Sequence, residues 1–265
     1  MNHLRQRTRA LSAATATAPA LLALLGAVLI AGCAAVPARD AITIAETAQA
    51  AIKSEPSTAF VLLVHGSGSS PREWPADFID MAYERPPGNA NPTAAASGIE
   101  APVDWIIVAF DWEETAARRL TAPRRGYAIG RALGEGLVSA RQSRIVIVAH
   151  SVGAHVAQGV IDGYRETGGR ARVDLVLLDP FLPRGVLRWR WGEAHFGLGA
   201  DRALNYYVRG DGVPGTDRPV VYAENRDLTN DVPSRHWNQT GAAHYWVARY
   251  FAEVIGVDLV ASGLP

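Results

Sequence analysis

The stretch RIVIVAHSVGAHVAQGVIDGY, residues 144–164, decides the fold. It begins with Arg144–Val148, a short apolar run without alternation, which is typical of a strand buried on both faces. It ends with Val152–Tyr164, in which apolar residues recur on one helical face. A tight turn centred on Ser151 must join strand to helix, and Gly153 supplies the small residue that such a turn needs.

Apolar runs and helical patterns alternate along the rest of the chain. We expect further strands at Phe60–Val64, Trp105–Phe110, Val173–Leu178, Ala203–Val208 and Pro219–Ala223, and further helices at Gly126–Val138 and Tyr245–Ile255. This alternation predicts an α/β protein with a mostly parallel central sheet and helices on both faces. The segment Pro86–Pro102, rich in Pro, Ala, Asn and Gly, predicts a surface loop.

The first residues are typical of an export signal. Three arginines, Arg5, Arg7 and Arg9, precede the uncharged apolar stretch Ala18–Ala31, which is shorter than a comfortable membrane span. Gly32 and then Cys33, the only cysteine of the chain, follow this stretch. We therefore expect residues 1–32 to be a lipoprotein signal peptide, residues 33–57 a lipidated N-terminus and spacer, and residues 58–265 one folded domain.

A small residue directly before Cys33 resembles the lipobox of bacterial lipoproteins. The resemblance implies that the thiol receives a diacylglyceryl group, and two or three acyl chains anchor a protein stably. By analogy with the sorting of Gram-negative lipoproteins, Ala34 in place of Asp favours the outer membrane, with the domain facing the periplasm. The alternative is an ordinary secretory signal with a chance cysteine, which would give a secreted protein.

Composition excludes several classes of function. The formal net charge of +0 gives no reason to expect nucleic acid as a partner. CxxC, HExxH and glycine-rich phosphate-loop patterns are absent from the sequence, so neither a metal nor a nucleotide cofactor is expected.

Four motifs carry a resemblance to a known family. They are Val64-His65-Gly66-Ser67, Phe110-Asp111-Trp112, the stretch HSVGAHVA at 150–157, and Leu178-Asp179-Pro180. Together they resemble the pancreatic-type lipases of the α/β-hydrolase superfamily, over about residues 57–255. The resemblance implies an α/β-hydrolase fold and a serine hydrolase whose nucleophile is Ser151.

The acid of the expected triad has two candidates. The family match implies Asp179, at the end of the fourth strand along the chain. Most α/β-hydrolases carry the acid after the next strand, where this chain has Asp211. The base comes last in chain order, before a terminal helix. His244 meets that requirement and is preferred to His236, which lies beside Trp237.

The remaining expectations concern the oxyanion hole and the substrate. Backbone N–H groups of Val152 and Ser67 should stabilise the oxyanion. The lipase lid would fall within Asn225–Ala243, which is short and favours an esterase or a small-lid lipase. The excursion Leu182–Leu204 holds tryptophans and arginines; it is expected either to cap an acyl pocket or touch lipid, or to be an ordinary surface helix.

The expected activity is cleavage of a small-molecule ester or a lipid through an acyl-enzyme, without a cofactor. Two alternatives stay open. One is a catalytically silent α/β-hydrolase domain that binds other molecules at the cell envelope. The other is an acyltransferase or thioesterase that uses the same triad.

Overall fold

The fold comes from a computed structural model, which describes residues 59–84, 105–139 and 142–262. Its strands are β1 (Ala59–Val64), β2 (Trp105–Phe110), β3 (Arg144–His150), β4 (Arg172–Leu178), β5 (Arg202–Tyr207) and β6 (Glu224–Asp227). Its α-helices are α3 (Trp74–Glu84), α5 (Glu113–Ala116), α6 (Ala122–Leu137), α7 (Gly153–Glu166), α8 (Ala242–Tyr250) and α9 (Gly256–Ser262). Short 3₁₀ turns are η1 (Val186–Arg188), η2 (Gly192–Ala194) and η3 (Ser234–Asn238), and η4 (Phe251–Ile255) is a π-helix turn.

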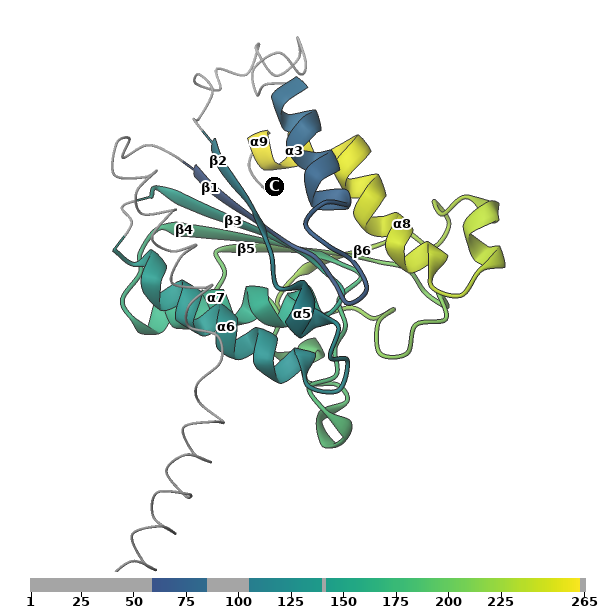
Figure 1. The fold of residues 1–265 in the computed structure, drawn as a ribbon, viewed down its shortest axis with the longest axis horizontal. Helices are drawn as coiled ribbons and strands as arrows, with labels where there is room; N and C mark the ends of the chain where they lie inside the picture. Colours follow the sequence, from purple (N-terminus) through teal and green to yellow (C-terminus); the bar gives the residue numbers. More distant parts are fainter. Residues whose placement is uncertain (1–58, 85–104, 140–141, 263–265) are drawn as a thin grey trace, which may run out of the picture. The chain divides into compact units, whose positions relative to one another are not determined.

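The six strands form one sheet in the order β2-β1-β3-β4-β5-β6, and every neighbouring pair is parallel. Helices α5, α6 and α7 lie on one side of the sheet, and α3, α8 and α9 lie on the other (Figure 1). The expected parallel sheet covered on both faces is therefore confirmed.

The two faces of the sheet have separate cores. Phe60, Leu62 and Val64 of β1 pack in the cluster that includes α6 and α7, whereas Val61 and Leu63 pack in the cluster that includes α3 and α8. Successive side chains of a strand point to opposite faces, so a strand between two helical layers must be apolar at every position. This explains why the strand runs show no alternation.

Helices α6 and α7 pack with their backbones in contact. A Cβ atom at Gly159 of α7 would lie 2.2 Å from the carbonyl oxygen of Tyr127, and one at Gly130 of α6 would lie 2.0 Å from that of Val156. Side chains larger than glycine cannot fit there. The close approach fixes α7, whose N-terminus follows Ser151, against its neighbour.

The predicted sixth strand is wrong. Residues 219–223 lie outside the strands, with a turn at 221–222, and β6 instead consists of the polar residues Glu224–Asp227 at the edge of the sheet. Asn225 explains the difference, because its side chain bonds both the N–H and the carbonyl of Val220 and holds that segment out of the sheet. An edge strand does not need apolar residues on both faces, so hydropathy did not reveal it.

Several expectations lie outside the described residues: the signal peptide, Cys33 and the spacer, and the loop Pro86–Pro102. Within the described ranges, no helix is both long and apolar enough to cross a membrane.

Candidate active site

Ser151 occupies the tight turn between β3 and α7. Its φ is 56°, a left-handed conformation that costs a non-glycine residue about 1 kcal/mol or more. The strained turn is held by its backbone, because the N–H of Ser151 donates to the carbonyl of Leu178 at 3.0 Å and its own carbonyl accepts from Phe181 at 3.0 Å. A Cβ atom at Gly153 would lie 2.8 Å from the carbonyl oxygens of Val64 and His65, which explains the glycine after the serine.

His244 lies between two aspartates. Its Nδ1 is 2.6 Å from Oδ2 of Asp179 and 3.2 Å from Oδ2 of Asp211. Asp179 directly follows β4 and Asp211 follows β5, so neighbouring parallel strands bring the two carboxylates to the same edge of the sheet. All three residues are buried. The two acids that the sequence offered as alternatives therefore meet at one histidine.

Each aspartate is also held by backbone. Oδ1 of Asp179 accepts from the N–H of Val208 at 3.3 Å, and Oδ1 of Asp211 accepts from the N–H of Val213 at 2.8 Å. The Thr216 hydroxyl lies 3.3 Å from Oδ2 of Asp211. Because a backbone N–H fixes one oxygen of each carboxylate, the other oxygen can point at the imidazole of His244.

His244 lies inside α8, not in the loop before the terminal helix. The predicted helix began at Tyr245, but α8 begins at Ala242, after Gly241, whose φ of 80° turns the chain into the helix. The apolar pattern from Tyr245 onward missed this first turn because its residues Ala242 and Ala243 are small. The short helix start still presents the His244 ring to the sheet edge.

Burial and the mutual interactions of His244, Asp179 and Asp211 set the electrostatics of the site. Burial lowers the pKa of His244, but hydrogen bonds and charges of Asp179 and Asp211 outweigh it and raise that pKa to about 9. Burial raises the pKa of Asp179 to about 7, with His244 opposing the shift. For Asp211, burial acts in the same direction, yet the hydrogen bonds from His244, Asp179 and Val213 hold its pKa below the usual range.

These three side chains are also the one group in the described residues whose His and carboxylate atoms cluster as metal ligands would. The spacing fits a hydrogen bond better. Ligand atoms about 2.0–2.2 Å from a metal, at angles of 90° or more, stand at least about 2.8 Å apart. The 2.6 Å contact of Asp179 with His244 is shorter than that and is typical of a charge-assisted hydrogen bond.

His150 links the serine turn to the histidine helix. It directly precedes Ser151, is fully buried, and its ring centroid lies 4.6 Å from that of His244. Its Nε2 lies 3.2 Å from the carbonyl oxygen of His244. Burial and the nearby His244 lower the pKa of His150 well below its usual value. A neutral His150 can therefore donate to the His244 backbone and position it.

The loop after β1 passes directly over Ser151. A Cβ atom at Gly66 would lie 2.8 Å from Cβ of Ser151, so this position must be glycine. Within the described part of the chain, the backbone N–H groups of Ser67 and Val152 donate to no other residue. Two free donors beside a serine hydroxyl are what an oxyanion hole at that serine would require.

Sequence reasoning missed Tyr245 as a contact of this loop. Its hydroxyl donates to the carbonyl of Ser67 at 3.1 Å, and its ring centroid lies 5.7 Å from that of His150. It therefore joins the loop after β1 to α8, which carries His244. The only signal in the sequence was its position next to His244.

Other candidates lie elsewhere. His236 is on η3, where its ring faces Trp246 at 6.5 Å, and the structure does not bring it to either aspartate. Within the excursion Leu182–Leu204, Trp191 and Phe196 are buried in the core cluster of α6 and α7, and Trp189 is half exposed. The excursion contains two 3₁₀ turns, so the expectation of an ordinary surface helix is wrong.

The comparison with protein families agrees with this architecture. The model of the alpha/beta hydrolase family matches residues 61–261, and the chain belongs to that family. It is accordingly hydrolase-like in fold and function. Among curated proteins no sequence matches the chain.

Two solved structures resemble this chain at low identity. The product of the gene lin2722 from Listeria innocua shares 11% identity with a TM-score of 0.43, over 75% of this chain and 95% of that one. A protein titled as a cell surface hydrolase from Lactobacillus plantarum WCFS1 shares 11% identity with a TM-score of 0.46, over 78% of this chain and 94% of that one.

Proposed function

We propose that the chain is a serine hydrolase that cleaves carboxylic esters, with Ser151 as nucleophile and His244 as general base. One observation carries the proposal. The same edge of the sheet holds a serine in a strained turn and a histidine that is hydrogen-bonded to a carboxylate. Ser151 has a φ of 56°, and His244 contacts Asp179 at 2.6 Å. Functional sites are where such backbone strain persists.

The proposed reaction has two steps. Oγ of Ser151 attacks the acyl carbon while Nε2 of His244 takes the hydroxyl proton, and the alcohol leaves with that proton. Water then gives a proton to His244 and attacks the acyl-serine, and His244 returns that proton to Oγ of Ser151 as the carboxylic acid leaves. The Ser67 and Val152 N–H groups stabilise the negative charge on the carbonyl oxygen, at about 3 kcal/mol per donor.

Asp179 and Asp211 act on His244 and not on the substrate. An acidic partner at Nδ1 keeps Nε2 free to accept the proton and stabilises the imidazolium that forms. We propose Asp179 as the principal acid, because it makes the shorter contact, and Asp211 as a second carboxylate that holds the same nitrogen. The motifs resembling pancreatic-type lipases support ester substrates.

The proposal extends to location. The residues before Cys33 support export, and the cysteine supports lipid anchoring at the bacterial cell envelope, with the outer membrane preferred over secretion. Growth with a palmitate analogue should label the full chain, and Cys33→Ser should abolish the label. Label that persists in Cys33→Ser would contradict the anchor without touching the enzyme proposal.

A fluorophosphonate probe tests the enzyme proposal. Labelling of the wild type should be lost in Ser151→Ala and reduced strongly in His244→Ala, while His236→Ala labels as the wild type does. If Ser151→Ala labels normally, or if the wild type does not label, the proposal is wrong. Labelling without ester turnover, but with acyl transfer to an added alcohol, would favour a transferase.

A further inference from the structure

The segment 184–191, here called the rim loop, exposes apolar side chains to solvent. Leu187 is 99% exposed, Val186 88% and Trp189 50%. A neighbouring turn between α5 and α6 adds Leu120, which is 94% exposed. Isolated exposed apolar residues are ordinary, but three within four residues of one loop mark a surface that contacts something apolar.

The rim loop is held in place by the structure beneath it. Trp191 stacks on His155 of α7 with ring centroids 5.4 Å apart, and the N–H of Gly192 donates to the carbonyl of Leu182 at 2.8 Å. The Arg184 guanidinium lies 4.4 Å from the Trp191 ring and 3.9 Å from that of Tyr127. These contacts hold in place the part of the loop that carries Val186 and Leu187.

Basic residues surround these apolar tips. Arg124 of α6 lines a groove with Gly185, Val186, Leu187 and Arg188. Its guanidinium lies over Gly185, 3.6 Å from where a Cβ atom there would be. Arg124 and Arg188 form no ion pair with another described residue, whereas Arg190 pairs with Glu193. The surface therefore combines unneutralised positive charge with exposed aliphatic groups.

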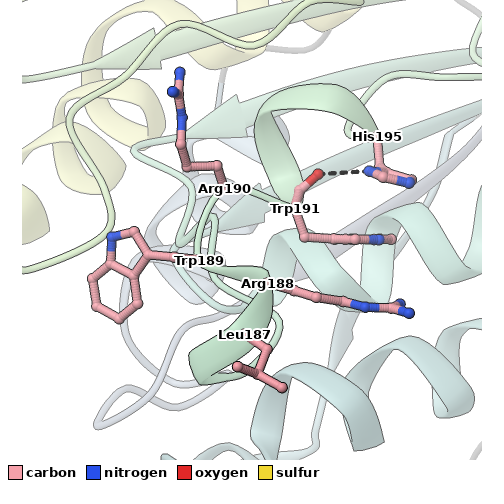
Figure 2. A pocket seen from close by; sticks show the side chains of 6 residues that line it. All are labelled: Leu187, Arg188, Trp189, Arg190, Trp191 and His195. Atoms are coloured by element: carbon pink, nitrogen blue, oxygen red, sulfur yellow. Dashed lines mark hydrogen bonds between the residues drawn. The ribbon is translucent and has the colours of Figure 1, made fainter.

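Figure 2 shows how the side chains of the rim loop spread. Trp189 points to one side, Arg188, Trp191 and His195 point to the other, and Leu187 lies at the outer turn. His195 is tied to the loop by its contact with the carbonyl of Trp191 at 2.6 Å. An indole, an aliphatic tip and guanidinium groups on one loop are the combination that interfacial membrane segments use.

The rim loop lies on the same edge of the sheet as the candidate active site. It follows the carboxyl end of β4, a few residues after Asp179, and Leu120 and Arg124 follow the carboxyl end of β2. In parallel neighbours these ends share one edge. A surface bound here would lie on the side of the molecule that carries Ser151.

We infer that the rim loop, with Arg124 and Leu120, docks onto a bilayer that contains anionic phospholipids. Phosphate groups would meet Arg124 and Arg188, and Val186, Leu187 and Trp189 would enter the boundary between headgroups and acyl chains. This contact goes beyond the proposed ester hydrolysis, and it requires neither catalysis nor a lipid on Cys33. It orients the domain on the membrane.

The single native cysteine allows a direct test. In the full chain carrying Cys33→Ser, the substitution Leu187→Cys gives one site for a polarity-sensitive fluorophore. Tyr83→Cys gives the matched control, because Tyr83 is 76% exposed on α3, which packs on the opposite face of the sheet. Each labelled protein is titrated with vesicles of phosphatidylglycerol and phosphatidylethanolamine, and with vesicles of phosphatidylcholine alone.

The inference predicts a blue shift at position 187, with anionic vesicles, and no shift at position 83. Adding Arg124→Glu and Arg188→Glu should raise the half-saturating lipid concentration by about tenfold or more. Equal shifts at both positions, no shift at position 187, or equal binding to neutral vesicles would overturn it. A fluorescence shift at position 187 that appears without lipid and grows with protein concentration would also overturn it, because a second copy of the chain would then cover the loop. Since Ser151 is intact throughout, ester turnover tests the proposed function separately.

Discussion

The carboxylate of Asp211 lies 3.2 Å from Nδ1 of His244, the nitrogen that Asp179 contacts at 2.6 Å. One N–H therefore faces two acids that arrive from neighbouring strands. A histidine held in this way keeps its ring orientation and tautomer even when one acid is removed. The site is consequently more tolerant of losing a single aspartate than a triad with one acid.

The two aspartates should be partly redundant. Asp179→Asn is expected to lower kcat about 100-fold and Asp211→Asn about tenfold, whereas the double variant should approach the ~10⁴-fold loss seen when a triad acid is replaced. Steady-state ester hydrolysis measures all three. A single Asp211→Asn variant as impaired as the double variant would show that Asp179 does not serve the histidine.

The raised pKa of His244 predicts that ester hydrolysis is fastest at alkaline pH. The general base must be neutral, and with a pKa near 9 only about one molecule in a hundred has a neutral His244 at pH 7. The value of kcat/KM should therefore rise about tenfold per pH unit from pH 7 and level off near pH 9. Asp211→Asn removes one cause of the raised pKa and should move this rise to lower pH.

The pH profile also has a clear contrary result. If the rise of kcat/KM with pH has its midpoint at or below pH 6.5, the ordinary pKa of histidine, then the aspartates do not stabilise the imidazolium in the free enzyme. If this midpoint is the same in Asp211→Asn as in the wild type, Asp179 alone raises the pKa of His244.

Gly66 should be needed for catalysis more than for folding. In Gly66→Ala the new methyl group would lie 2.8 Å from Cβ of Ser151, so the loop must move and carry the Ser67 N–H away from the oxyanion. We expect a loss in kcat of about 100- to 1,000-fold, the effect of removing one oxyanion donor. Thermal unfolding serves as the control, and a fall in kcat that simply follows lost folded protein would contradict this role.

Gly159 should be needed for stability. Gly159→Ala places a methyl group 2.2 Å from the backbone carbonyl oxygen of Tyr127, and Gly163→Ala does the same against Arg131. Because a backbone cannot turn aside as a side chain can, each substitution should lower the free energy of unfolding by about 1–3 kcal/mol or more. Urea denaturation measures it, and an unchanged midpoint would show that α6 and α7 are less closely packed.

Hydropathy predicted the strands that lie between two helical layers because burial on both faces demands continuous apolar runs. It failed at β6, where Glu224–Asp227 at the sheet edge is polar, and at the start of α8, whose first two residues, Ala242 and Ala243, are small. The choice between Asp179 and Asp211 could not be made from the sequence. Both follow strands, and only the pairing of β4 with β5 shows that both reach His244.

The most direct test of the proposed function is to trap the acyl-enzyme. After a p-nitrophenyl ester is mixed with the protein and quenched in acid, mass spectrometry should find the acyl group on the tryptic peptide 145–165, whose only serine is Ser151. The account predicts a burst of p-nitrophenol of about one equivalent and an adduct that is absent from Ser151→Ala. Ester turnover that persists undiminished in Ser151→Ala, with no adduct on this peptide in the wild type, would contradict it.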